Sequence, residues 1–119
     1  MQVVVTKHHG LGNDFLVLDL GQLQKLDQSK IDWPSVVKLW CDRQNGVGAD
    51  GLLLLTRVAD FKLTMQLLNQ DGSRAEMSGN GIRCLAQAAF DLDGHQTAVS
   101  YTVATDASDR VVDVEPVTH

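Results

Sequence analysis

The stretch of the chain that decides its fold is residues 78–91, Ser78-Gly79-Asn80-Gly81-Ile82-Arg83-Cys84-Leu85-Ala86-Gln87-Ala88-Ala89-Phe90-Asp91. Apolar residues recur at positions 82, 85, 86, 89 and 90, which is the spacing of one helix face. Cys84 and Ala88 make much of the opposite face apolar as well. Because a helix that is apolar nearly all round belongs inside a protein, this segment predicts a buried central helix with strands on several sides.

Short runs rich in Val and Leu supply the surrounding strands, which we predict at residues 2–7, 14–19, 51–58, 61–69, 98–105 and 110–114. Residues 8–13 form the loop between the first two strands. A second helix is predicted after Asp32, its cap, with Pro34 in its first turn and an end before Gly46. The fold class is therefore α+β, a curled and mostly antiparallel sheet wrapped around one central buried helix.

The composition fits one ordinary globular domain. The 119 residues are 44% hydrophobic and 21% charged, without an apolar run of 18 residues or a secretory signal pattern. The formal charge is −5, and the few Lys and Arg residues are scattered singly, which disfavours nucleic acid or an anionic membrane as the partner. We expect a cytoplasmic protein with a small-molecule or protein partner.

The two cysteines, Cys41 and Cys84, have neither zinc-ligand spacing nor the number needed for a disulfide framework, and no metal site is expected. Each lies in a segment with helical apolar spacing. Both are therefore predicted to be buried structural thiols, and neither is a catalytic candidate.

Glycines gather in four short segments, where short polar side chains accompany them: Asn13, Asn69, Asp71 and Asn80. An asparagine amide offers donors and an acceptor, so several together can bind both the ammonium and the carboxylate of an amino acid. The alternative is that these residues serve only as turn formers.

Ser78-Gly79-Asn80-Gly81 opens the predicted central helix, where unpaired N–H groups and the helix dipole attract an anion. A carboxylate fits better than a nucleotide, because no Lys stands beside the segment and the phosphate-loop spacing is absent. The alternative is that Ser78 is simply the N-cap of the helix.

Four segments in this order resemble the diaminopimelate epimerase family: Lys7 to Phe15; Cys41-Asp42-Arg43 with Gly46 to Gly51; Asn69 to Ser73; and Glu76 to Cys84. The resemblance covers residues 7–84. It implies a fold of two pseudo-symmetric halves, each a sheet around a central helix, with the active site between them. On this resemblance we expect residues 1–119 to correspond to the N-terminal half, with the C-terminal half absent.

The resemblance also implies the chemistry. Members interconvert LL- and meso-diaminopimelate in lysine biosynthesis without pyridoxal phosphate or another cofactor, using one cysteine from each half as the two proton-transfer groups. Carried over, Asn13, Asn69, Gly79 and Asn80 match substrate-binding positions, and Ser78 stands where the first catalytic cysteine would be. A serine hydroxyl is far less acidic than a thiol, so this chain alone is expected to be inactive.

The sequence has one further difference from the family, and two alternative functions stay open. The doubled His8-His9 replaces one histidine of the family, and both are expected to have a structural role in the loop. One alternative belongs to a different class of function: the domain is a catalytically silent module that binds a small amino acid or carboxylate. The other alternative is an interaction domain, and an unpaired half is expected to self-associate, for example as a homodimer.

Overall fold

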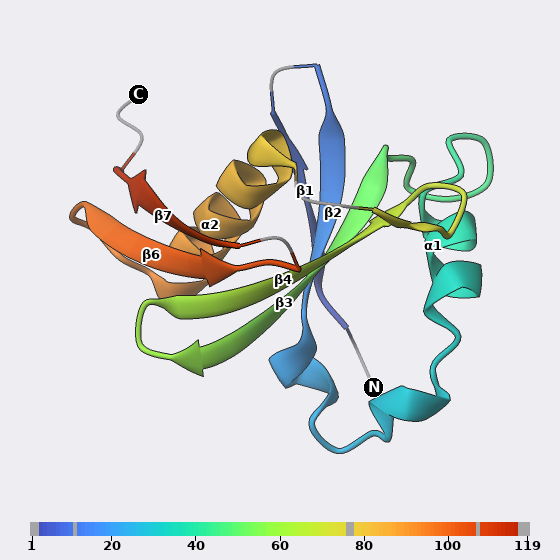
Figure 1. The fold of residues 1–119 in the computed structure, drawn as a ribbon. Coiled ribbons are helices and arrows are strands. Elements are labelled where there is room, and N and C mark those ends of the chain that lie inside the picture. Colours follow the sequence, from blue (N-terminus) through green and yellow to red (C-terminus); the bar gives the residue numbers. More distant parts are fainter. Residues whose placement is uncertain (1–2, 11, 76–77, 107, 117–119) are drawn as a thin grey trace.

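The computed structural model describes residues 3–10, 12–75, 78–106 and 108–116 (Figure 1). Within these ranges it contains one seven-stranded sheet in the order β1-β2-β3-β4-β6-β7, with β5 paired to β4. The elements are β1 (Val5–His9), β2 (Asp14–Asp19), η1 (Leu20–Leu23), η2 (Gln28–Lys30), α1 (Trp33–Trp40), β3 (Gly51–Ala59), β4 (Lys62–Asn69), β5 (Arg74–Ala75), α2 (Gly79–Asp93), β6 (Val99–Ala104) and β7 (Asp109–Val114).

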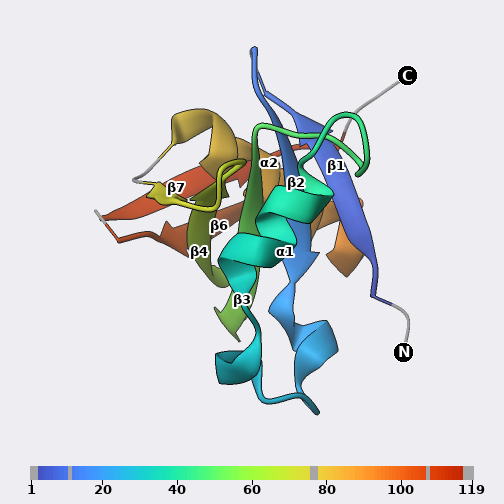
Figure 2. The same ribbon diagram turned by 90° about the vertical axis from the view of Figure 1, so that its right-hand side faces the viewer.

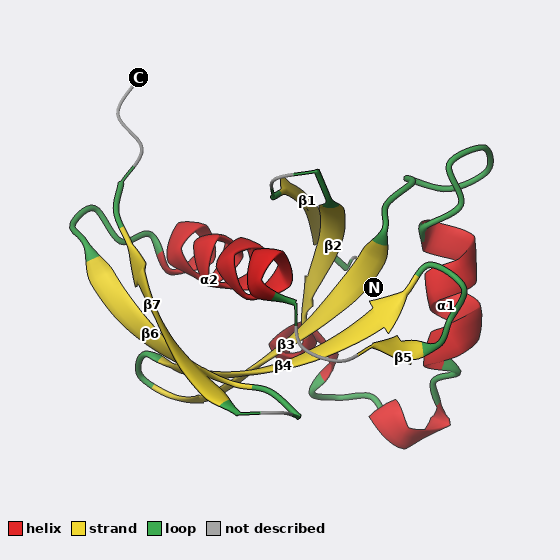
Figure 3. Cartoon of the chain, turned by 45° about the horizontal axis from the view of Figure 1, so that its top comes forward, coloured by secondary structure: helices red, strands yellow, loops and turns green. Residues whose placement is uncertain are grey.

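The sheet curls around α2, and this confirms the predicted fold class (Figures 1 and 3). Four pairings are antiparallel, β1 with β2, β3 with β4, β4 with β5 and β6 with β7. The two parallel pairings, β2 with β3 and β4 with β6, each join strands that are separated in the chain by a helix. The curl brings both β1 and β7, the strands at the ends of the sheet order, into contact with α2.

The central helix α2 is buried, as its apolar pattern predicts. Leu85, Ala86 and Ala89 have no exposed surface, and Cys84 is 4% exposed. The helix extends to Asp93, two residues beyond the predicted segment, and ends at Gly94, whose positive φ of +70° provides the left-handed cap. Over the described part of the chain, no helix is long and apolar enough to cross a membrane.

Strand β2 and residues 51–55 of β3 are buried on both faces, and both segments are rich in apolar residues. Phe15 and Val17 belong to the core around α2. The alternating residues Leu16 and Leu18 belong to a second core with Val37 of α1. Helix α1 thus covers the sheet face opposite α2 (Figure 2).

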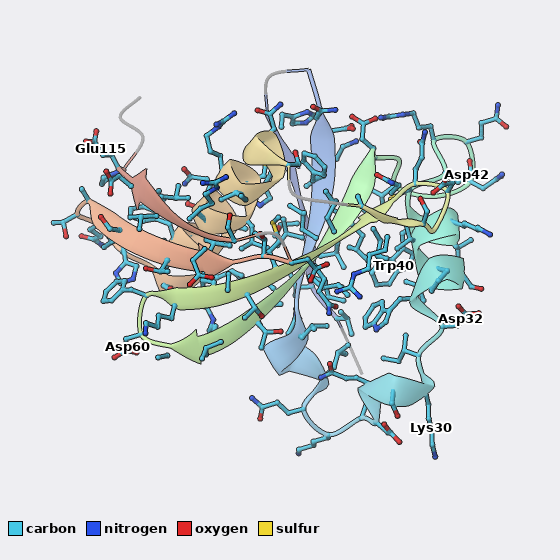
Figure 4. All side chains as sticks on the ribbon, in the orientation of Figure 1. Lys30, Asp32, Trp40, Asp42, Asp60 and Glu115 are labelled. Atoms are coloured by element: carbon cyan, nitrogen blue, oxygen red, sulfur yellow. The ribbon has the colours of Figure 1, made fainter. Side chains whose placement is uncertain are left out.

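Helix α1 begins as predicted. The Asp32 side chain accepts a hydrogen bond from the Ser35 N–H, Pro34 lies in the first turn, and Trp40 is the last helical residue (Figure 4). Cys41 follows as the C-cap and is 1% exposed. The expectation that both cysteines are buried is confirmed, and burial raises the pKa of each thiol.

The sequence prediction was wrong for His8 and His9, which belong to β1 and not to the loop. Pairing with β2 continues as far as His9 opposite Asp14. The connection is therefore a tight turn, closed by a hydrogen bond of 2.8 Å from the Gly10 N–H to the Asn13 carbonyl. The short helices η1 and η2, each started by an aspartate cap, and the two-residue strand β5 were not predicted.

The C-terminal end of α2 is tied to the sheet by Asp93. The Tyr101 hydroxyl on β6 donates to the Asp93 carboxylate at 2.8 Å, and Arg57 at the end of β3 pairs with it at 2.8 Å. Tyr101 has no exposed surface, and burial together with this carboxylate raises its pKa. These contacts offset the unfavourable position of a carboxylate at the negative end of a helix.

Truncation of the α2 core should destabilise the fold strongly. We expect Leu85→Ala to lower the free energy of unfolding by about 2–5 kcal/mol, because it leaves a cavity between the helix and the sheet. Leu92→Ala on the same helix is the control, since Leu92 is 49% exposed, and should change it by less than about 0.5 kcal/mol. Urea denaturation measures both, and equal effects would contradict the central position of α2.

Candidate active site

Three strand ends meet at one edge of the sheet. Strands β2 and β3 are parallel, with Phe15 opposite Gly51, and β4 runs back so that Asn69 also lies opposite Gly51. Asn13, Asp50 and Asn69 therefore stand at neighbouring ends of three strands. Helix α2 begins at this same edge, because Asn80 in its first turn contacts Asn13.

The start of α2 is capped by Ser78. Its backbone is extended, with φ −122° and ψ 123°, and its Oγ accepts a hydrogen bond from the Gly81 N–H at 3.1 Å. Ser78 is thus the N-cap of α2. The first turn of α2 carries no acidic side chain, so no carboxylate of the helix itself offsets the positive end of its dipole.

The turn between β1 and β2 packs directly against this helix start. A Cβ on Gly10 would lie 2.9 Å from the Asn80 Cβ, so only glycine allows this approach. Across the contact, Asn80 Nδ2 donates to Asn13 Oδ1 at 3.1 Å. The Arg83 guanidinium, one turn further along α2, donates to Asn80 Oδ1.

A network of charges behind the turn was not anticipated from the sequence. Arg43, in the loop after α1, donates two hydrogen bonds to the Asp14 carboxylate, at 2.9 and 3.1 Å, and one to Asp50 at 3.1 Å. Asp14 is 8% exposed and also accepts the Asp50 N–H at 3.0 Å and lies 3.4 Å from Lys7 Nζ. The Arg43 guanidinium holds the pKa of the Asp14 carboxyl well below its usual range.

Asn69 is held by its own hairpin and not by the other candidate residues. Its Nδ2 donates to Ser73 Oγ at 3.1 Å, and its N–H donates to the Ser73 carbonyl at 2.8 Å. Gly72, with φ +89°, makes the tight turn possible. The structure thus joins Asn13, Gly79 and Asn80 in one group beside Ser78, and Asn69 stands on the same sheet edge without a hydrogen bond to them.

Two hollows lie beside the connection between β1 and β2. The first, of about 350 Å³, is lined by His9, Gly10, Gly12, Asn13, Asp14, Arg43 and Asp50. The second, of about 380 Å³, is lined by His8, His9, Gly10, Arg83, Cys84 and Gln87. Burial lowers the pKa of His8, whose Nε2 lies 2.9 Å from Thr6 Oγ1. Leu11, Glu76 and Met77, which belong to the motifs quoted above, lie outside the described residues.

A sequence model of the diaminopimelate epimerase family matches residues 5–119. The chain belongs to this family. A diaminopimelate epimerase of Prochlorococcus marinus is 47% identical over 102 residues, which are 84% of this chain and 33% of that protein. One from Thermosynechococcus vestitus is 41% identical over 118 residues, 97% of this chain and 40% of that protein. The chain therefore spans about a third to two-fifths of these relatives.

Solved structures share the fold at low sequence identity. A methylitaconate-delta-isomerase superposes with a TM-score of 0.69 and 13% identity. The superposition covers 98% of this chain and 60% of the isomerase chain. A protein from Pseudomonas aeruginosa, described as a predicted epimerase, gives a TM-score of 0.64 and 12% identity over 88% of this chain and 33% of its own. The curled sheet around a central helix is thus an architecture found in these known proteins.

The Asp14–Arg43 pair should stabilise the site in a pH-dependent way. We expect Asp14→Asn to lower the free energy of unfolding by about 1–3 kcal/mol, because charge-assisted hydrogen bonds from Arg43 are lost. The pKa of Asp14 is lowered in the folded state, so its carboxylate stabilises the fold fully above about pH 4. The destabilisation caused by Asp14→Asn is therefore largest there and shrinks as the pH falls further.

Denaturation of the two proteins from pH 3 to pH 7 measures this difference. Asp60→Asn is the control, because Asp60 is exposed at the turn between β3 and β4, away from this network (Figure 4). A difference between Asp14→Asn and the unchanged chain that is constant over the whole range would contradict the ionic role of Asp14.

Proposed function

We propose that this chain is the N-terminal half of a cofactor-independent epimerase that interconverts LL- and meso-diaminopimelate in lysine biosynthesis. Residues 1–119 form one domain of that enzyme, and a C-terminal half completes the site. The family match over residues 5–119 supports this proposal, as does the span of only 33–40% of the relatives. A cytoplasmic location accompanies this role.

The observation that carries the proposal is the meeting of Asn13, Gly79 and Asn80 at the start of α2. An amino acid presents a carboxylate next to its α-carbon, and the helix start offers N–H groups and a positive dipole end to that carboxylate. These N–H groups and the helix dipole also stabilise the negative charge that develops on the substrate when the α-proton leaves. Asn69 contributes from the neighbouring end of β4.

Proton transfer requires a group at position 78 and a second group on the opposite face of the α-carbon. A thiol at a helix N-terminus ionises easily and is a competent base. Ser78 keeps its proton at neutral pH, and its Oγ is already the acceptor for the Gly81 N–H. We therefore propose that Ser78 holds the position of the base without its activity, and that the second half supplies the other group.

The Ser78 cap also favours a second candidate function, a catalytically silent module that binds a small amino acid or carboxylate. All binding features of the helix start are compatible with serine, and only the proton transfer is lost. Self-association into a homodimer is a further proposal, because the faces meant for a second half stay open in an isolated chain.

Exchange of the α-proton in deuterated water tests the proposed position of the base. Residues 1–119 are fused to the remaining part of the Thermosynechococcus vestitus relative, and the fusion is compared with its Ser78→Cys and Ser78→Ala forms. Diaminopimelate should exchange at least about 100-fold faster with Ser78→Cys, because general base catalysis contributes that much or more. Ser78→Ala should match the unchanged fusion.

Two results would contradict this account. If the unchanged fusion exchanges as fast as Ser78→Cys, Ser78 or another residue is a working base. If no form exchanges although the fusion is folded and binds diaminopimelate, position 78 is not the site of the base, and the binding module becomes the better description.

A further inference from the structure

We infer that Arg83 is a positioning residue, which together with Asp50 fixes the direction of a hydrogen-bond chain through Asn80 and Asn13. The inference rests on the proposed function, in which those two amides face the substrate. It assigns a task to an arginine that does not itself need to touch the reacting atoms.

The chain runs across three elements. Arg83 Nη2 donates to Asn80 Oδ1 within α2. Asn80 Nδ2 donates to Asn13 Oδ1 at 3.1 Å, from α2 to the turn before β2. Asn13 Nδ2 donates to Asp50 Oδ2 at 3.3 Å, at the start of β3, and Arg43 closes the chain on Asp50 Oδ1 at 3.1 Å.

The two ends decide the direction. A guanidinium has only donors, so the oxygen of Asn80 must face Arg83. An ionised carboxylate has only acceptors, so the nitrogen of Asn13 must face Asp50. Both requirements agree with Asn80 Nδ2 donating to Asn13 Oδ1, whereas an isolated asparagine pair could adopt either orientation with equal numbers of hydrogen bonds.

The consequence concerns the substrate. Within the chain each amide uses its oxygen and one N–H of its NH₂ group, so the direction of the chain decides where the second N–H points, beside a helix start that is itself a set of N–H donors. With these N–H groups held in a fixed direction, the helix start favours the carboxylate of the amino acid over its ammonium group. Arg83 thereby helps to hold the substrate carboxylate at the start of α2.

The position of Arg83 supports this role over a purely structural one. Its side chain is exposed, and within the described ranges it makes no ion pair. Its Nη1 lies 3.8 Å from where a Cβ on Gly79 would be, so the cation stands over the positive end of α2. A cation there is unfavourable for helix stability, and it becomes favourable when an anion binds.

A charge at position 83 has opposite effects on helix stability and on anion binding, and the test uses this difference. It compares the unchanged chain with the Arg83→Met, Arg83→Lys and Arg83→Glu variants. Glutamate near the start of α2 should keep or raise the melting temperature through the helix dipole. It should also turn the Asn80 amide around, because a carboxylate accepts where arginine donates. Gln87→Met is the control. Gln87 lies one turn further along α2, lines the second hollow together with Arg83, and donates a hydrogen bond to Asp91.

The first readout needs no ligand. In nitrogen-15 spectra of the chain alone, the side-chain NH₂ signals of Asn80 and Asn13 should move in Arg83→Met and move most in Arg83→Glu. They should stay in place in Arg83→Lys and Gln87→Met. If the two amide signals of Arg83→Met coincide with those of the unchanged chain, Arg83 does not set the direction and the inference is overturned.

The second readout is the affinity for meso-diaminopimelate, measured by titration of the same variants made in the fusion to the C-terminal part of the Thermosynechococcus vestitus relative. We expect about 3- to 10-fold weaker binding for Arg83→Met, corresponding to one net hydrogen bond, with Arg83→Lys within about 2-fold. Equal affinity of all variants, with moved amide signals, overturns the link to the substrate. Absence of binding to the unchanged fusion counts against the proposed function, and the amide signals of the chain alone then decide the positioning role separately.

Discussion

The burial of α2 is the constraint on which the rest of the structure depends. A helix with apolar residues on nearly every side is stable in water only if other elements cover it, and in this chain the sheet does so by curling until β1 and β7 both contact it. Asp93 fixes the far end of the helix to β3 and β6 through Arg57 and Tyr101. The position of the other end, with Ser78 as its cap, follows from the same packing.

This placement creates the candidate site, because the N-terminus of a buried helix emerges at the edge where three strands end. The charges there are arranged in layers. Asp14 and Asp50 are balanced by Arg43 and Lys7 behind the turn, and the amides of Asn13 and Asn80 lie next to this network at the helix start. Gly10 allows this turn to touch the helix at all. We propose a carboxylate as the ligand of this arrangement.

Most of the fold could be predicted because its signals are local. The helix pattern of residues 78–91 and the cap at Asp32 depend on neighbours in the sequence, and both predictions are confirmed. His8 and His9 were misassigned because a doubled histidine before glycine gives no strand signal, and only pairing with β2 extends β1 to include them. The site residues Asn13 and Asn80 were identified one by one. Their contact, and the Asp14–Arg43 pair, join residues far apart in sequence, so register and packing decide them.

The claim that the start of α2 is an anion-stabilising position can be tested most directly by the pKa of a thiol placed there. Thiolate absorbance of the Ser78→Cys chain is titrated against pH, with the unchanged chain as the reference for Cys41 and Cys84, whose pKa values burial raises. We expect the pKa of the introduced thiol to lie below the ordinary cysteine value of about 8.5. A pKa at or above that value would contradict it, because the helix start would then not stabilise a negative charge.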